Sequence, residues 1–151
     1  MSELKRILIA EDSENDVELT LVALKEHRLA NEVIIVRDGV EALDYLLRRD
    51  AFASHPSGNP AVVLLDLKMP RMDGIGVLRT MRSDPRLQTI PVVILTSSKE
   101  ERDLVESYKL GVNAYVVKPV RFQQFVEAVQ TLGLFWGVLN EPPPGSVRRS
   151  A

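Results

Sequence analysis

The sequence predicts an α/β fold, in which helices cover both faces of a doubly wound sheet of five parallel strands. Five short runs rich in Ile, Val and Leu recur along the chain. The runs are continuous rather than alternating, which is typical of strands that are buried on both faces. A segment with helical spacing of its apolar residues follows each run, so strand and helix alternate five times. This alternation favours right-handed crossovers and places binding groups outside the carboxyl ends of the strands.

The first strand and the first helix are predicted over residues 4–10 and 14–28. Apolar residues of the helix follow a period of 3.6, which predicts one buried face. Ser13 and Asp16 have the spacing of a capping box, in which a serine hydroxyl and an acidic side chain satisfy free N–H groups at the start of a helix.

The other four strand and helix pairs repeat this pattern. Strands are predicted over residues 32–36, 61–66, 91–96 and 113–117, and helices over residues 39–49, about 74–82, 99–110 and 120–139. Ser98 and Glu101 have the spacing of a second capping box. Residues 48–61 are polar and rich in turn residues, which indicates a surface loop before the third strand.

Length and composition indicate one globular domain. The chain has 151 residues, of which 45% are hydrophobic, and a Pro-rich segment follows the last helix. We therefore expect a domain over residues 1–140 and a poorly ordered tail over residues 141–151. The 19 basic and 21 acidic residues give a formal charge of -2, which favours neither nucleic acid nor a membrane surface as a partner. The chain has no cysteine and no apolar run of membrane-spanning length, so we expect a soluble cytoplasmic protein.

Polar and charged side chains follow four of the five predicted strands. Glu11 and Asp12 end the first strand, Asp66 the third and Thr96 the fourth, and Lys118 follows the fifth. In a parallel sheet these groups converge on one edge, where three carboxylates would repel one another without protons or a cation. A hard cation with oxygen ligands resolves this, and Mg²⁺ fits best, with Mn²⁺ or Ca²⁺ as substitutes. Such a metal favours phosphate chemistry, to which the lysine adds a positive charge and the threonine a hydroxyl donor.

Each of these residues also has an ordinary explanation when it is taken alone. Glu11 and Asp12 would suit the positive end of the helix that follows them, and Asp66 would suit a turn. The ordinary explanations do not account for five such groups at the carboxyl ends of strands in one sheet. The group as a whole therefore favours a functional site.

Four motifs around these residues resemble the receiver domains of two-component response regulators. The motifs are ILIAEDS, LLDLKMPRMDG, VVILTSS and AYVVKPV. The spacings of 30 residues from Asp66 to Thr96 and of 22 from Thr96 to Lys118 are usual in that family. The resemblance covers roughly residues 5–135 and implies a flavodoxin-like sheet with strand order 2-1-3-4-5.

The resemblance also implies a role for each matching residue. Asp66 matches the phosphoacceptor, whose carboxylate attacks the phosphohistidine of a sensor histidine kinase and forms an acyl phosphate. Asp12, Asp66 and the backbone carbonyl of Lys68 match the ligands of Mg²⁺, and Glu11 acts largely through water. Lys118 matches the lysine that pairs with the phosphoryl group.

Three further positions match the conformational switch of the family. Thr96 matches the hydroxyl that moves toward the phosphoryl group, and Tyr115 matches the aromatic side chain whose rotamer follows it. The Lys118–Pro119 bond matches a peptide bond that is usually cis in the family. Without the resemblance, Tyr115 would be interpreted as a core aromatic residue and Pro119 as a trans proline at the start of a helix.

Three functional classes are consistent with such a domain. The favoured one is a phosphorylation switch, which is not an enzyme beyond its own phosphotransfer and dephosphorylation; its alternative is a degenerate receiver or dimeric adaptor that signals without phosphate. An aspartyl phosphatase usually has a second Asp, its general acid, two residues after the nucleophile. This chain has Lys68 there, and a lysine cannot act as that carboxylic acid. A DNA-binding regulator would need an effector domain after about residue 140.

We also hypothesise that Lys68 alters the lifetime of the acyl phosphate.

The end of the predicted last helix carries more apolar residues than one buried face requires. Phe135 and Trp136 either cap the edge of the sheet or form a self-association patch. The long loop before the third strand, VRDGVEALDYL, SYKLGVNAY and the FW pair resemble the stand-alone receivers that work with bacterial and cyanobacterial phytochrome kinases. This resemblance implies a phytochrome histidine kinase as partner and a homodimer.

Overall fold

The computed structural model describes residues 5–25, 31–49, 52–53, 59–112 and 114–131. Five parallel strands form one sheet in the order β2-β1-β3-β4-β5, which confirms the predicted fold class and strand order. The strands are β1 (Lys5–Ala10), β2 (Asn31–Val36), β3 (Val62–Asp66), β4 (Val92–Thr96) and β5 (Ala114–Val117). The helices are α1 (Glu14–Lys25), α2 (Gly39–Leu47), α3 (Gly74–Ser83), α4 (Lys99–Ser107) and α5 (Phe122–Thr131).

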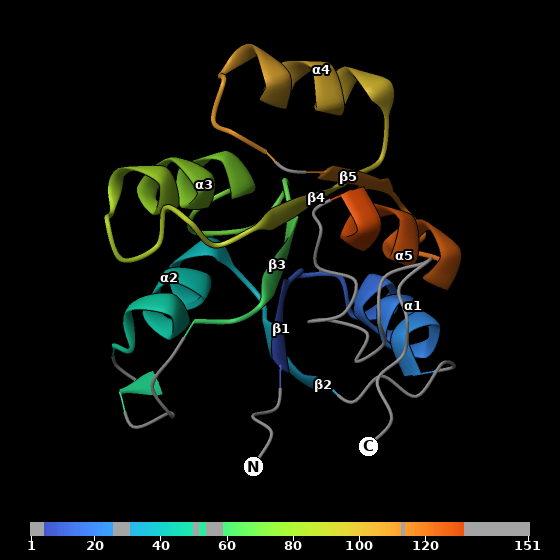
Figure 1. Ribbon diagram of the computed structural model, residues 1–151, viewed down its shortest axis with the longest axis horizontal. Coiled ribbons are helices and arrows are strands. Elements are labelled where there is room, and N and C mark those ends of the chain that lie inside the picture. Colours follow the sequence, from blue (N-terminus) through green and yellow to red (C-terminus); the bar gives the residue numbers. More distant parts are fainter. Residues whose placement is uncertain (1–4, 26–30, 50–51, 54–58, 113, 132–151) are drawn as a thin grey trace, which may run out of the picture.

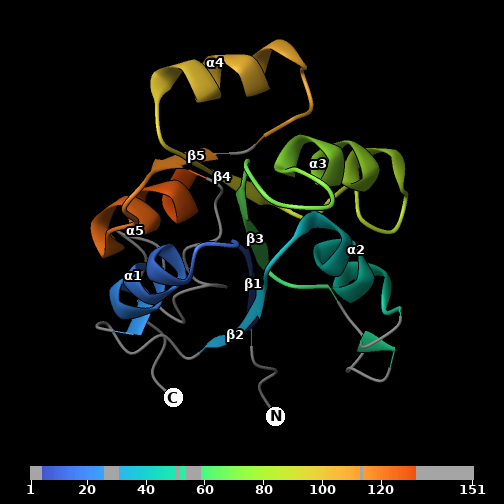
Figure 2. The ribbon, with the colours of Figure 1, turned by 180° about the vertical axis from the view of Figure 1, so that it is seen from behind.

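Helices cover both faces of the sheet. Figures 1 and 2 show α1 and α5 side by side on one face and α2 and α3 on the other, with α4 beyond β4 and β5. Every residue of β3 and of β4 is buried, as the continuous apolar runs predict. No helix in the described part of the chain has the length and apolar content that a membrane span requires.

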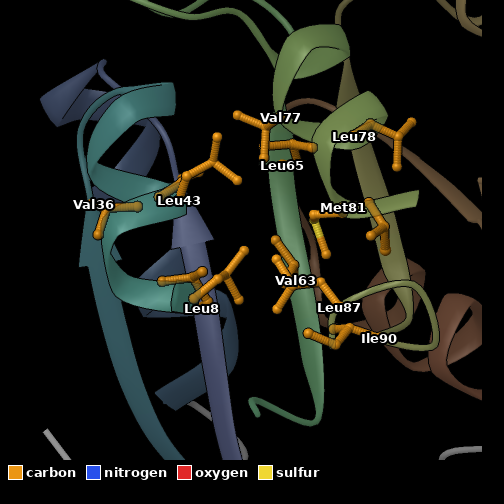
Figure 3. Packing of buried hydrophobic residues seen from close by; sticks show 14 of the residues in the cluster. Leu8, Val36, Leu43, Val63, Leu65, Val77, Leu78, Met81, Leu87 and Ile90 are labelled. Carbon is orange, nitrogen blue, oxygen red and sulfur yellow. The ribbon is translucent and has the colours of Figure 1, made fainter. Parts of the chain in front are cut away.

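The alternation of side chains along the strands divides the core into two clusters. In β3, Val63 and Leu65 belong to the cluster under α2, α3 and α4, and Val62 and Leu64 belong to the cluster under α1 and α5. Figure 3 shows the first cluster, in which side chains of α3 such as Val77 lie against those of β3. The sheet is therefore packed against helices on both faces. This packing fixes the carboxyl ends of the strands, which position the polar residues that follow them.

Two helices end earlier than their apolar pattern predicts. The helix predicted over residues 39–49 ends at Leu47, because Arg48 adopts a left-handed conformation with φ of 56°. The helix predicted over residues 99–110 ends at Ser107, and the left-handed residues Lys109 and Gly111 turn the chain toward β5. The predicted end of the first helix and residues 132–139 of the last lie outside the described residues.

Both predicted capping boxes form only in part. The Ser98 hydroxyl accepts a hydrogen bond from the Glu101 N–H at 3.3 Å, but the Glu101 carboxylate accepts from the Ser97 N–H at 2.6 Å, one residue before the expected donor. The Ser13 hydroxyl accepts from the Asp16 N–H at 3.3 Å, whereas the Asp16 carboxylate binds a residue far along the chain. The serine of each box therefore caps its helix, and the acidic residues have other contacts.

One arginine of α3 joins two loops. The Arg82 guanidinium donates hydrogen bonds to the carbonyls of Gln88 and Ile90 before β4 and of Leu110 and Gly111 before β5, at 2.9 to 3.1 Å. Burial lowers the pKa of Arg82. A single side chain thus fixes the segments through which the chain enters two neighbouring strands.

Replacing Arg82 with Met is expected to lower the free energy of unfolding by about 2–4 kcal/mol, because partly buried carbonyls lose a charged donor. Urea unfolding followed by circular dichroism measures this change. Arg79→Met is the matched control: Arg79 is an exposed residue of the same helix, and its guanidinium lies 4.6 Å from the centre of the Tyr108 ring. We expect the control to lose less than about 1 kcal/mol, and equal losses would contradict the role of Arg82.

Candidate functional site

The carboxyl ends of β1, β3, β4 and β5 bring the predicted site residues together. The register pairs Ala10 with Leu65 and Thr96 with Val117, so the residues that follow these strands meet at one edge. Glu11, Asp66 and Thr96 are buried there, at 1%, 5% and 1% exposure, while Asp12 is exposed. Burial of two carboxylates requires compensating positive charge.

Lys118 supplies part of that charge. Its Nζ lies 3.1 Å from Glu11 Oε2, 3.1 Å from Asp66 Oδ1 and 3.1 Å from Asp16 Oδ2. An ammonium has three N–H donors, so Lys118 has as many carboxylate neighbours as it has hydrogen atoms to donate. Burial alone lowers the pKa of Lys118, but the hydrogen bond to Glu11 and the charge of Asp66 outweigh burial and raise it above its ordinary value. Lys118 is therefore a permanent positive charge at this site.

The pKa of the Glu11 carboxyl is strongly raised at this site. Burial, followed by the contact and the charge of Asp66, raises the pKa of Glu11 to about 7, although the hydrogen bond from Lys118 opposes the shift. One ammonium thus does not balance the negative charge of this edge at neutral pH. The remaining imbalance favours a bound cation.

Three carboxylates form a group that fits a metal ion. Glu11, Asp12 and Asp66 each offer an oxygen, and these oxygens lie within 4.8 Å of one another. Oxygen donors alone suit Mg²⁺, Mn²⁺ or Ca²⁺ rather than zinc, and one exposed ligand leaves room for water on the ion. The chemistry of these side chains therefore matches a divalent cation.

The loop after β3 is held against neighbouring elements. The Leu67 N–H donates to Asp66 Oδ1 at 2.9 Å, and the Gly74 N–H donates to the Leu67 carbonyl at 2.9 Å, which closes the loop. Arg71 donates to both carboxylate oxygens of Asp38, the residue that caps α2. The residues that follow Asp66 therefore have a defined path.

The Lys68 side chain is exposed and contacts α4. It is 83% exposed, and its Nζ lies 3.7 Å from Glu101 Oε1 in the first turn of α4. This contact joins the loop after β3 to the first turn of α4. Exposed ion pairs of this length contribute little to the stability of the fold. The predicted effect of Lys68 on the lifetime of the acyl phosphate stays a prediction.

The predicted switch residues lie on the β4–β5 side of the site. The Thr96 carbonyl accepts a hydrogen bond from the Lys118 N–H at 2.8 Å, and the Lys118–Pro119 bond is cis, the isomer that the resemblance implies. Tyr115 is half-buried, and the Arg102 guanidinium lies 4.8 Å from the centre of its ring. Burial and the nearby Glu106 carboxylate raise the pKa of Tyr115, so this phenol is neutral at physiological pH.

Sequence reasoning missed one member of the site. The sequence pattern predicts only a capping-box role for Asp16, yet its carboxylate accepts a hydrogen bond from Lys118, 102 positions further along the chain. Its place in the first turn of α1, four residues after Asp12, is the sequence signal that points to this edge of the sheet. The predicted dimer residues Phe135 and Trp136 lie outside the described residues.

Comparison with known proteins identifies the family. The profile of the response regulator receiver domain matches residues 7–130. The chain belongs to this family. A receiver of this family is a signalling switch of two-component systems, so the sequence-based identification is confirmed.

The relatives of this receiver include several phytochrome response regulators. The bacteriophytochrome response regulator RtBRR is 62% identical in its solved structure, with a TM-score of 0.86, over 95% of this chain and 87% of that one. Response regulator Rcp1 from Synechocystis sp. is 39% identical over 87% of this chain and 88% of its own length. The solved Mn²⁺-bound form of Rcp1 is 37% identical, with a TM-score of 0.71, over 93% of this chain and 99% of that one. The receiver thus has relatives with whole-length similarity among phytochrome response regulators.

Proposed function

We propose that Asp66 accepts a phosphoryl group from the phosphohistidine of a sensor histidine kinase. An Asp66 carboxylate oxygen attacks phosphorus, the phosphorus–nitrogen bond breaks, and the histidine keeps the electron pair of that bond. The observation that carries this proposal is the position of Asp66: it is buried at the end of β3, 3.1 Å from a lysine and within the carboxylate group that suits a cation. A carboxylate in such a place is a nucleophile with positive charge ready for the phosphoryl oxygens.

The other site residues have supporting roles in this reaction. Asp12, Asp66 and the backbone carbonyl of Lys68 would hold Mg²⁺, and Glu11 would contact it largely through water. The metal neutralises charge on the phosphoryl oxygens when it is bound. Lys118 pairs with a phosphoryl oxygen.

The output of the switch is a protein contact at the face formed by α4, β5 and α5. A groove of about 470 Å³ lies there between Arg102, Tyr115 and Gln124. Leu104, Tyr108 and Val117 are exposed on α4, the turn after it and β5. Movement of Thr96 toward a phosphoryl group and of Tyr115 after it would change this apolar surface.

The names of the relatives support a proposal for the partners. Two similar proteins are named as bacteriophytochrome response regulators and one as a cyanobacterial phytochrome response regulator. We therefore place this receiver, with a domain over residues 1–140, downstream of a phytochrome histidine kinase in the cytoplasm, as a homodimer in which Phe135 and Trp136 contribute to the contact.

Labelling with a small phosphodonor tests this function. The full chain is incubated with acetyl phosphate and Mg²⁺, and mass spectrometry locates the added phosphoryl group after borohydride reduction of the acyl phosphate. We expect a single modification at Asp66 that disappears with a chelator. A chain that takes up no phosphoryl group would be a degenerate receiver that signals without phosphate.

Metal affinity is expected to depend on pH through Glu11. Below its pKa of about 7 this carboxyl is protonated in the metal-free protein, so a cation must displace the proton. Mn²⁺ affinity should therefore rise by up to about tenfold per pH unit toward pH 7 and level off above it. The amplitude of free Mn²⁺ in electron paramagnetic resonance between pH 5.5 and 8.5 measures this. In Glu11→Gln the Mn²⁺ affinity should be weaker and should no longer rise between pH 5.5 and 8.5. If the affinity of this variant still rose with pH as in the wild type, the titrating proton would belong to a group other than Glu11.

A further inference from the structure

Asp16 lies where the first turn of α1 meets the segment after β5. Its N–H donates to the Ser13 hydroxyl that caps the helix, so the backbone of Asp16 is fixed by the start of α1. Its carboxylate is 29% exposed and accepts a hydrogen bond from Lys118 Nζ at 3.1 Å. Figures 1 and 2 both show α1 beside α5, the helix that follows Lys118 in the chain. The contact therefore joins the first turn of α1 to the segment that leads from β5 into α5, the helix beside α1.

The three carboxylates around Lys118 differ in what else they can bind. Glu11 and Asp66 belong to the group whose oxygens lie within 4.8 Å of one another, and Asp16 does not. A cation held by that group would offset the negative charges of Glu11 and Asp66, so these carboxylates would attract the Lys118 ammonium less. The cation would also repel the ammonium directly. Among the described residues, Asp16 is thus the one carboxylate neighbour of Lys118 that lies outside the metal-binding group.

We propose that Asp16 is a positioning residue for Lys118, which keeps the ammonium beside Asp66 after a metal has bound and until the phosphoryl group arrives. This inference rests on the proposed function of Asp66. Phosphorylation exchanges one acceptor of the ammonium for another, because a phosphoryl oxygen replaces the Asp66 carboxylate. The bond to Asp16 is retained in this exchange and fixes the direction of the Lys118 side chain. The ammonium then loses less freedom when it pairs with the phosphoryl group.

Two binding measurements on the full chain test the role of Asp16. Mn²⁺ affinity is measured by electron paramagnetic resonance without any phosphoryl analogue, and beryllofluoride affinity is measured by fluorine NMR at saturating Mg²⁺. Beryllofluoride bonds to a carboxylate oxygen and presents fluorines where phosphoryl oxygens would lie. For Asp16→Asn we expect beryllofluoride affinity to fall about tenfold, because the charged acceptor of Lys118 is lost. Mn²⁺ affinity should change by less than about threefold.

Two further variants separate positioning from a general effect of charge. Glu14→Gln removes the same charge from the same turn of α1, but Glu14 is 73% exposed and pairs with Arg37 rather than with Lys118. We expect this control to bind both probes as the wild type does. Asp16→Glu keeps a charged acceptor on one additional methylene group and should recover most of the lost beryllofluoride affinity.

Three results would overturn the inference. In the first, Asp16→Asn binds beryllofluoride as tightly as the wild type. In the second, it loses affinity for Mn²⁺ and beryllofluoride equally, which would indicate only a change in net charge. In the third, the wild type itself fails to bind beryllofluoride, and the proposed function of Asp66 then falls as well. Binding by the wild type separates the failure of the inference from the failure of the function.

Discussion

Asp66→Asn is expected to abolish phosphorylation of this receiver. The amide has the shape of the carboxylate but no anionic oxygen, so it cannot attack phosphorus, and labelling by acetyl phosphate should fall by roughly 10³-fold or more. The fold should be retained. Asp66 is buried beside Glu11, whose pKa it raises, so the substitution also removes repulsion between two acids. Incorporation is measured on intact protein by mass spectrometry.

Asp103→Asn is the matched control for this substitution. Asp103 is an exposed residue of α4, away from the strand ends, and its variant should be labelled as fast as the wild type. Rapid labelling of Asp66→Asn at another carboxylate would assign the phosphoacceptor to that residue instead. Full-rate labelling of both variants would remove Asp66 from the mechanism.

Gly74→Ala is expected to lower the free energy of unfolding by about 2–4 kcal/mol and to impair phosphorylation as well. A Cβ atom at Gly74 would clash with the Asp66 carbonyl oxygen and would lie 2.9 Å from the Leu67 Cα. Both are backbone atoms of the strand end that carries the phosphoacceptor, and they cannot move without displacing Asp66. Urea unfolding and the rate of acetyl phosphate labelling measure the two effects.

The same helix contains a control for this prediction. A Cβ atom at Gly76 would meet the Met72 side chain, with Cγ at 2.8 Å, and a flexible side chain can turn away. The hydrogen bond from the residue 76 N–H to the Asp73 carboxylate is retained in an alanine variant. We expect Gly76→Ala to stay within about 1 kcal/mol of the wild type, since alanine also favours the helix. If both variants were equally stable, the close approach of Gly74 to β3 would not limit substitution.

Most of the fold and of the candidate site could be predicted from local sequence patterns. The continuous apolar runs identify β3 and β4, because a strand covered on both faces has no polar alternation. Position at the end of such a run then brings Glu11, Asp66 and Thr96 to one edge. The two early helix ends could not be predicted, because Arg48 and Lys109 are left-handed residues other than glycine.

The sequence by itself determined the alternation of strands and helices, the family and the places of the acids, the threonine and the lysine around Asp66. These features depend on the order of residues within short segments and on the parallel sheet that such segments form. Only the tertiary structure decided which groups the long polar side chains bind: Asp16 binds Lys118, and Arg82 binds the carbonyls of two loops. A flexible side chain reaches several partners from one position, and the packing of distant segments determines which of them is within hydrogen-bond distance.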